Sequence, residues 1–303
     1  VLLWLPIITN QEWQPRISEG SVFYNSIYNS LFSSQWTGQI IAFVLMLLEA
    51  FLLLWLDLRI FIFEKKNILP PFLFVLLVSV FAPNYNLLPM MLANLFFLFS
   101  ISRAMHSEFT VDSAKNYFES SLFIGLGTLF YPPMFAMLMF VLVALFIMKN
   151  SGLREFLAII LGFITPFVFY IFFTFIDDRP AELFTRMEQL LVPHESMLDL
   201  SIIQYCASGF SVLFILTAII AMSQLVRTYK ITSRKFFSIF IWNIIIAVAA
   251  YFLIPASGLT LLILASMAIS FIGAMYFFEI RRRVPGEIVF CLIIICAFLI
   301  VYL

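Results

Sequence analysis

The feature that most constrains this chain is a series of long apolar segments, of which Gln39–Phe63 is the clearest. A helix needs about 20 consecutive apolar residues to cross the hydrocarbon core of a bilayer, and this segment is longer than that. Of the 303 residues, 63% are hydrophobic and 11% are charged, whereas a soluble domain has roughly 25% charged residues. There is too little polar surface to cover a globule in water, so the sequence predicts an all-α polytopic membrane protein.

We expect a single helical domain over residues 1–303 with about 10–11 transmembrane helices, judged by the length that a bilayer requires. The expected spans after Gln39–Phe63 are 69–82, 87–102, 117–131, 133–148, 156–176, 202–226, 236–254, 259–278 and 287–303, and the run 1–6 resembles the end of an earlier helix. Segments 69–82 and 117–131 are short, so each can either cross the membrane or be re-entrant. Gly162 and Pro166 predict a bend in 156–176.

Two polar stretches, 7–37 and 177–200, each contain an apolar stripe with helical spacing. In the first, aromatic and aliphatic residues between positions 23 and 32 share one face. In the second, the stripe runs from Leu183 to Leu191. Both stretches are therefore predicted to hold amphipathic helices that lie along the membrane surface.

The lysines and arginines indicate the orientation, because basic residues collect in cytoplasmic loops. If the loops alternate and 7–37 lies outside, all basic residues fall on the inner side except Arg16, Arg179 and Arg186. The stretches 7–37 and 177–200 then lie on the outer side of the membrane, and both surface helices face outward.

Glu49 lies near the middle of the opening apolar segment, where a charged carboxylate costs on the order of 2.5–3.5 kcal/mol. We expect it to face protein or a cavity and to be neutral or paired, with Asn94 of the segment 87–102, a Ser or Thr, or a buried Tyr as its partner. It is either a structural hydrogen-bonding group or a site for protons or substrate. Asp57 follows roughly 80° around the helix and is expected to reach the inner interface beside Arg59, so Glu49, Asn94 and Asp57 form the candidate intramembrane polar site.

The loops hold the other candidates for chemistry. Glu12 and Glu19 in the first outer loop are candidate catalytic carboxylates, since a general base must lie within hydrogen-bond reach of its acceptor. Asp177, Asp178 and His194 in the second outer loop are weak candidates for a divalent-cation site, although solvated loop acids are the simpler interpretation. No cofactor motif is present, and the net charge of +0 gives no reason to expect a nucleic-acid partner.

Two resemblances add to this interpretation. The layout of outer-loop acids before a surface helix resembles polyprenyl-phosphate-sugar glycosyltransferases of the GT-C fold, which implies a general base in the first outer loop and a lipid-linked donor. A closer resemblance, to an uncharacterised family of Bacteroidota inner-membrane proteins, is carried by NLFFLFSISRAMHSEF, LFIGLGTLFYPPMFAMLMF, GFITPFVFY and SRKFFSIFIWNIIIAVAAYFLIP. It implies a bacterial inner-membrane location, with the stretches 7–37 and 177–200 periplasmic, and it offers no known catalytic residues to carry over to this chain.

Three functions follow as alternatives. The most specific is a GT-C-like glycosyltransferase or glycan-assembly component that uses a polyprenyl-phosphate-linked donor on the periplasmic side. The second is a non-catalytic membrane subunit of an envelope assembly, with membrane-protein partners. The third is a transporter or flippase with Glu49 at its midplane site. Membrane lipids are expected partners in all three.

Overall fold

A computed structural model gives the fold of the chain. It describes residues 4, 35–60, 67–80, 87–110, 112–148, 152–176, 216–220, 231–254, 259–279 and 283–302. These residues form helices and short connections, and no strand occurs among them. The all-α prediction is therefore confirmed, while both predicted surface helices, the span 202–226 and the segment 1–6 apart from Trp4 lie outside the described residues.

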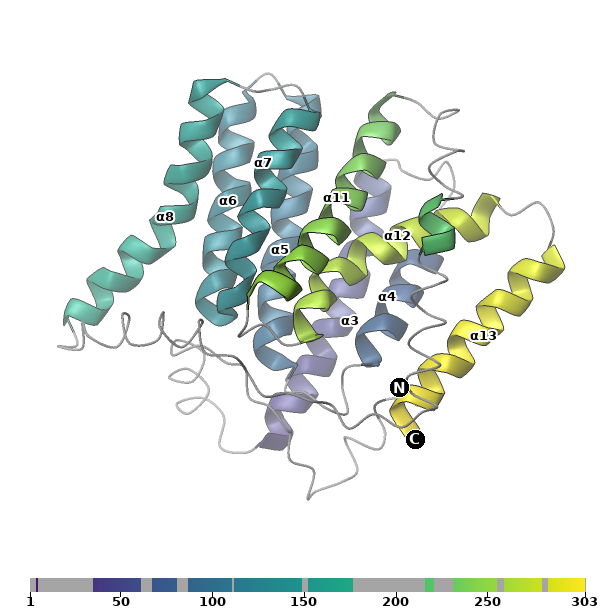
Figure 1. The fold of residues 1–303 in the computed structure, drawn as a ribbon. Coiled ribbons are helices and arrows are strands. Elements are labelled where there is room, and N and C mark those ends of the chain that lie inside the picture. The colour runs from purple at the N-terminus through teal and green to yellow at the C-terminus, as the bar shows by residue number, and fades with distance from the viewer. Residues whose placement is uncertain are drawn as a thin grey trace.

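The described helices form a bundle of mostly upright elements (Figure 1). The α-helices are α3 (Gln35–Ile60), α4 (Leu69–Ser79), α5 (Leu88–His106), α6 (Ser113–Phe130), α7 (Leu138–Ile147), α8 (Leu153–Ile176), α11 (Ile231–Leu253), α12 (Ile263–Glu279) and α13 (Arg283–Tyr302). Short 3₁₀ elements η2 (Ser107–Phe109), η3 (Pro132–Met137) and η5 (Leu259–Leu262) join some of them. Prolines occupy the first turns of α4, α5 and η3, where a missing N–H costs nothing.

Five stretches of the described helices are long and apolar enough to cross a membrane: Gly38–Asp57, Leu88–Phe109, Leu153–Phe172, Ile231–Leu253 and Thr260–Phe278. Three shorter apolar stretches are Leu69–Ser79, Pro132–Ile147 and Glu287–Leu299. The prediction that 69–82 is short is confirmed, since α4 has 11 residues. By the rise of about 1.5 Å per residue, α4 alone covers roughly half of a bilayer core.

The boundaries of α5 and α6 differ from the prediction. The sequence predicted a polar connection over 103–116, but α5 continues to His106 and α6 begins at Ser113. A helix keeps its backbone hydrogen bonds after leaving the hydrocarbon, so polar residues such as Arg103 need not end it. The expected short segment 117–131 thereby belongs to an 18-residue helix, and η3 with α7 returns beside it (Figure 1).

The most extensive helix packing among the described elements joins α6 to α8. A Cβ on Gly125 would lie 2.7 Å from the carbonyl oxygen of Phe163, and one on Gly162 would lie 2.3 Å from that of Phe118. Glycines let membrane helices approach this closely, because side chains no longer separate the backbones. Away from this contact, α8 exposes large apolar side chains, as expected for a lipid-facing helix. It also changes direction partway along its length (Figure 1), as predicted for a helix that contains Pro166.

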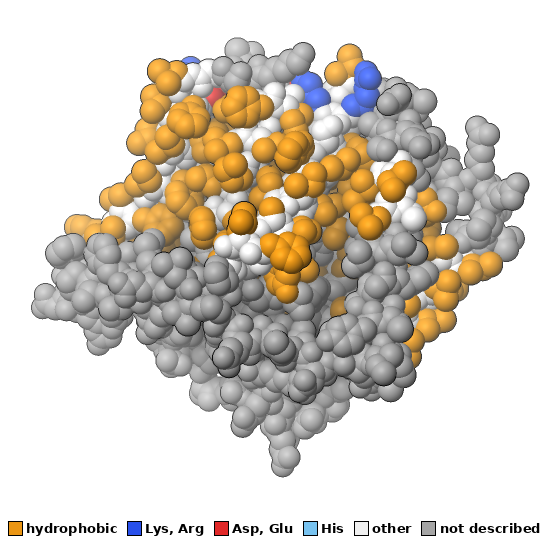
Figure 2. Space-filling model, viewed as in Figure 1, with side chains coloured by type: hydrophobic (Ala, Val, Ile, Leu, Met, Phe, Trp, Pro, Cys, Tyr) orange, Lys and Arg blue, Asp and Glu red, His pale blue; other side chains and the backbone are white. Residues whose placement is uncertain are grey.

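The outside of the described bundle is largely apolar. Orange hydrophobic side chains cover the visible described surface, and the blue Lys and Arg side chains gather at its upper end (Figure 2). At that end α5 and α7 finish and α6, α8 and α11 begin (Figure 1). Arg103, Lys115, Arg154, Arg234 and Lys235 lie in these helix ends, as the assignment of one basic side requires.

This arrangement gives a topology prediction. In a variant whose three native cysteines are replaced by alanine, Lys115→Cys is expected to resist a membrane-impermeant maleimide in intact spheroplasts and to react after permeabilisation. Arg186→Cys is expected to react in intact spheroplasts. Lys115 is chosen because its side chain is 73% exposed, so burial does not protect it. Reaction of Lys115→Cys in intact spheroplasts would reverse the orientation.

Candidate functional site

A hydrogen bond between Glu49 and Asn94 joins α3 to α5. These two residues are called the Glu49–Asn94 pair below. Glu49 lies within the span Gly38–Asp57 of α3, and Asn94 lies on α5. The Nδ2 atom of Asn94 donates a hydrogen bond to Oε2 of Glu49 over 2.8 Å. Glu49 is 0% exposed and Asn94 is 2% exposed. Of the partners considered, Asn94 is the one observed, and Glu49 faces protein and not lipid.

The short helix α4 ends close to this pair. Ser79, the last residue of α4, has its hydroxyl 3.9 Å from the sulfur of Met46 on α3. Met46 precedes Glu49 by three residues, so the two lie about one turn apart on the same side of α3. The indole Nε1 of Trp4 also donates to the Ser79 hydroxyl, over 2.9 Å. The end of α4 is thereby fixed in the interior, and Figure 1 shows it well above the lower end of α3.

The pair leaves two oxygen atoms without a partner. Oε1 of Glu49 and Oδ1 of Asn94 are both buried, and neither has a hydrogen-bond partner among the described residues. Buried polar atoms in proteins are nearly always bonded, so an exception points to a functional role or to a bound water or ion. Within the described residues, the pair thus has more acceptors than donors.

Asp57 differs from its prediction. Its side chain was expected to reach the interface, but Asp57 is 4% exposed and therefore packs against protein. Two turns of α3 separate it from Glu49. Glu49 and Asp57 lie on the same helix, and the hydrogen bond to Asn94 is made by Glu49.

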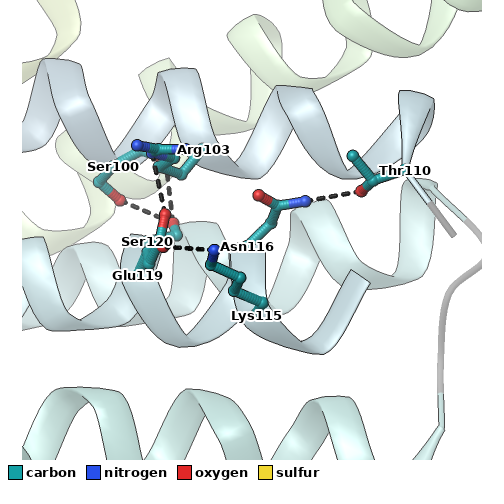
Figure 3. Close-up of polar contacts among 7 residues, drawn as sticks. All are labelled: Ser100, Arg103, Thr110, Lys115, Asn116, Glu119 and Ser120. Carbon is teal, nitrogen blue, oxygen red and sulfur yellow. Dashed lines mark hydrogen bonds and ion pairs between the residues drawn. The ribbon is translucent and has the colours of Figure 1, made fainter. Parts of the chain in front are cut away.

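A second polar group joins α5 to α6 near the basic end (Figure 3). The Ser100 and Ser120 hydroxyls lie 2.9 Å apart, and Ser120 also donates to the carbonyl oxygen of Ser100. One turn further on, Arg103 Nε lies 3.0 Å from Oε2 of Glu119. Lys115 Nζ lies 3.9 Å from the other carboxylate oxygen, Oε1. Exposed ion pairs contribute at most about 1 kcal/mol, so these contacts mainly set the register of the two helices.

The strongest charge contact at this end joins distant parts of the chain. Lys235 Nζ on α11 donates to both carboxylate oxygens of Glu108 in η2, over 2.5 and 2.7 Å. The side chains are 20% and 17% exposed, so water screens the pair little. The rings of Phe109 and Phe236, the next residue in each segment, lie 6.2 Å apart. No local pattern in the sequence signalled this contact, which spans 127 positions.

Reversing these charges provides a test of the contact. Lys235→Glu alone is expected to destabilise the detergent-solubilised protein by roughly 1–3 kcal/mol, because it places two acids together in a half-buried site. The double variant Glu108→Lys with Lys235→Glu is expected to recover most of that loss. Thermal unfolding followed by tryptophan fluorescence measures both. Equal losses in the single and double variants would mean that the pair contributes nothing.

The remaining candidate site residues belong to the two loops. Glu12, Glu19, Asp177, Asp178 and His194 lie outside the described residues. Among the residues that the structure describes, no three His, Cys, Asp or Glu side chains are grouped as metal ligands would be. The catalytic and metal-binding roles of the loop residues stay predictions.

Comparison with known proteins gives a match to a protein family. The model of a family of unknown function, DUF6427, matches residues 21–303. No curated protein and no solved structure matches the sequence. The match begins before α3 and includes every described helix. The chain therefore belongs to the DUF6427 family.

Proposed function

We propose that this protein is a transporter or flippase of the bacterial inner membrane, with the Glu49–Asn94 pair at its working site. One observation carries the proposal: Glu49, an acid near the middle of an apolar span, lies wholly inside the protein, about one turn from the contact that α3 makes with the end of the short helix α4. Ionisable residues in such places are costly and commonly mark the path of a substrate or ion. Short or interrupted helices frequently flank the binding sites of transporters.

Two features of the described helices support this function over a purely structural pair. The structural alternative needs a pair whose polar atoms are satisfied, because each orphaned buried atom costs free energy. Glu49 and Asn94 each retain an unpartnered oxygen among the described residues. The η3–α7 segment is a second interrupted element, since Pro132–Met137 is a 3₁₀ helix that continues into an α-helix.

Water access to the pair tests the proposal. A working site must open to at least one aqueous side, whereas a structural pair stays sealed. In the cysteine-free variant, Asn94→Cys is expected to react with a small cationic methanethiosulfonate reagent from one side of the membrane. Right-side-out and inside-out vesicles identify that side, and Lys115→Cys is the control for an exposed position.

A lack of reaction in both vesicle orientations, with Lys115→Cys reacting normally, would exclude the transport proposal. It would favour the alternative of a non-catalytic subunit of an envelope assembly. The glycosyltransferase prediction depends on Glu12 and Glu19, and it is tested separately by Glu→Gln substitution at each position.

A further inference from the structure

We infer that the Glu49–Asn94 pair binds a monovalent cation, either a proton or a sodium ion, as the coupling ion of the proposed transporter. The inference rests on the proposed function and adds the chemical class of the ligand. It is drawn from an imbalance of charge and of hydrogen-bonding groups around the pair.

The first part of the imbalance is a shortage of donors. Glu49 offers two acceptor oxygens and Asn94 offers one, but the Nδ2–H group of Asn94 satisfies only Oε2 of Glu49. Oε1 of Glu49 and Oδ1 of Asn94 keep unused acceptor capacity while fully buried. A proton would convert the Glu49 carboxylate into a donor, and a small cation would accept electron density from both oxygens.

The second part is that the described helices packed against α3 supply no basic partner. Among the described elements, those with extensive contact to α3 are α4 and α5. No residue of α4 is titratable, and α5 has only Arg103 and His106, at its far end. On α3 itself the other charged groups are Asp57 and Arg59, two turns or more from Glu49. These helices supply no lysine or arginine at the depth of Glu49.

The third part is the direction of α4. This helix ends at Ser79, which contacts α3 one turn from Glu49. The carboxyl end of a helix has a partial negative charge and free carbonyl oxygens. In discontinuous membrane helices such ends coordinate Na⁺ or H⁺. An acid, an amide oxygen and a helix carboxyl end together favour a cation over an anion or a neutral substrate.

Thermal unfolding of the purified protein in detergent tests the inference with each ion alone. Melting temperatures are measured in choline chloride and in the chlorides of sodium, lithium and potassium, at constant ionic strength and at several pH values. A ligand that binds only the folded protein raises the melting temperature in a saturable manner. We expect such a rise with sodium or with falling pH, and we expect Glu49→Gln to abolish it.

The matched control is Glu119→Gln, the same substitution at an acid outside the pair, which should leave the ion-dependent rise unchanged. If Glu49→Gln does not fold, Asn94→Ala replaces it and should weaken half-saturation at least about tenfold, equivalent to about 1.4 kcal/mol. If the rise in melting temperature with sodium is lost in the variant, the bound ion is sodium. If the rise with falling pH is lost, the bound ion is the proton.

Melting temperatures that depend on neither ion, or that keep their ion dependence in Glu49→Gln, would overturn the inference. That failure is distinct from failure of the transport proposal. If Asn94→Cys reacts with the cationic methanethiosulfonate reagent but the melting temperature depends on neither ion, the transport proposal stands. Only the inference about the coupling ion is then rejected.

Discussion

Gly162→Ala is expected to separate α8 from α6 and to lower the free energy of unfolding by roughly 1–3 kcal/mol, the usual cost of overpacking. The added Cβ would lie 2.3 Å from both the carbonyl oxygen of Phe118 and the hydroxyl of Ser121. The first is a backbone atom, so the new methyl group cannot be accommodated by a side-chain rotation. In an open helix the same substitution would stabilise, because glycine is a poor helix former.

Gly152→Ala is the matched control for this experiment. Its Cβ would also meet an atom at 2.3 Å, but that atom is Oε2 of Glu155, at the end of a flexible side chain. We therefore expect a change within about 0.5 kcal/mol. Thermal unfolding and limited proteolysis in detergent measure both variants. Equal stability of Gly162→Ala and Gly152→Ala would show that α8 does not need its close contact with α6.

Asn94→Leu is expected to destabilise the protein by about 1–2 kcal/mol, the range of hydrogen bonds inside membrane proteins. It removes the hydrogen bond to Oε2 of Glu49. Neither carboxyl oxygen of this buried acid then has a hydrogen-bond partner among the described residues. Glu49→Leu is expected to cost less, because it orphans the Asn94 amide but also removes an oxygen that had no partner among the described residues.

The double variant Glu49→Leu with Asn94→Leu is expected to be nearly as stable as the native protein. Replacing both partners of a buried hydrogen bond with apolar groups is often close to neutral, whereas replacing one is not. Unfolding measurements on the four proteins form a double-mutant cycle. Additive losses in the double variant would contradict the contact. A stable double variant that has lost ion-dependent stabilisation would separate the pair's function from its structural contribution.

Much of the membrane architecture could be predicted from the sequence because lipid imposes strong local rules. A span requires a minimum apolar length, so α3, α8, α11 and α12 were expected close to their observed positions. The contact between Glu49 and Asn94 was also predictable. A polar group inside such a span must find a partner on another helix, and few candidates exist.

Helix ends and side-chain depth were less predictable. Arg103 and His106 suggested a loop, but backbone hydrogen bonding continues beyond the hydrocarbon and α5 includes both residues. Asp57 was expected to reach water, and its burial at 4% exposure depends on how neighbouring elements cover that part of α3. The nearby Arg59 in the sequence does not reveal that other parts of the protein cover Asp57.

The sequence by itself determined that the chain is an all-helical membrane protein with one basic side, because apolar length and charge placement act locally. Only the tertiary structure decided which helices touch. Three contacts join segments that are distant in sequence: the packing of α6 against α8 at Gly125 and Gly162, the pairing of Lys235 with Glu108, and the end of α4 beside Met46. Such contacts depend on shape complementarity between whole helix faces, which a one-dimensional pattern does not specify.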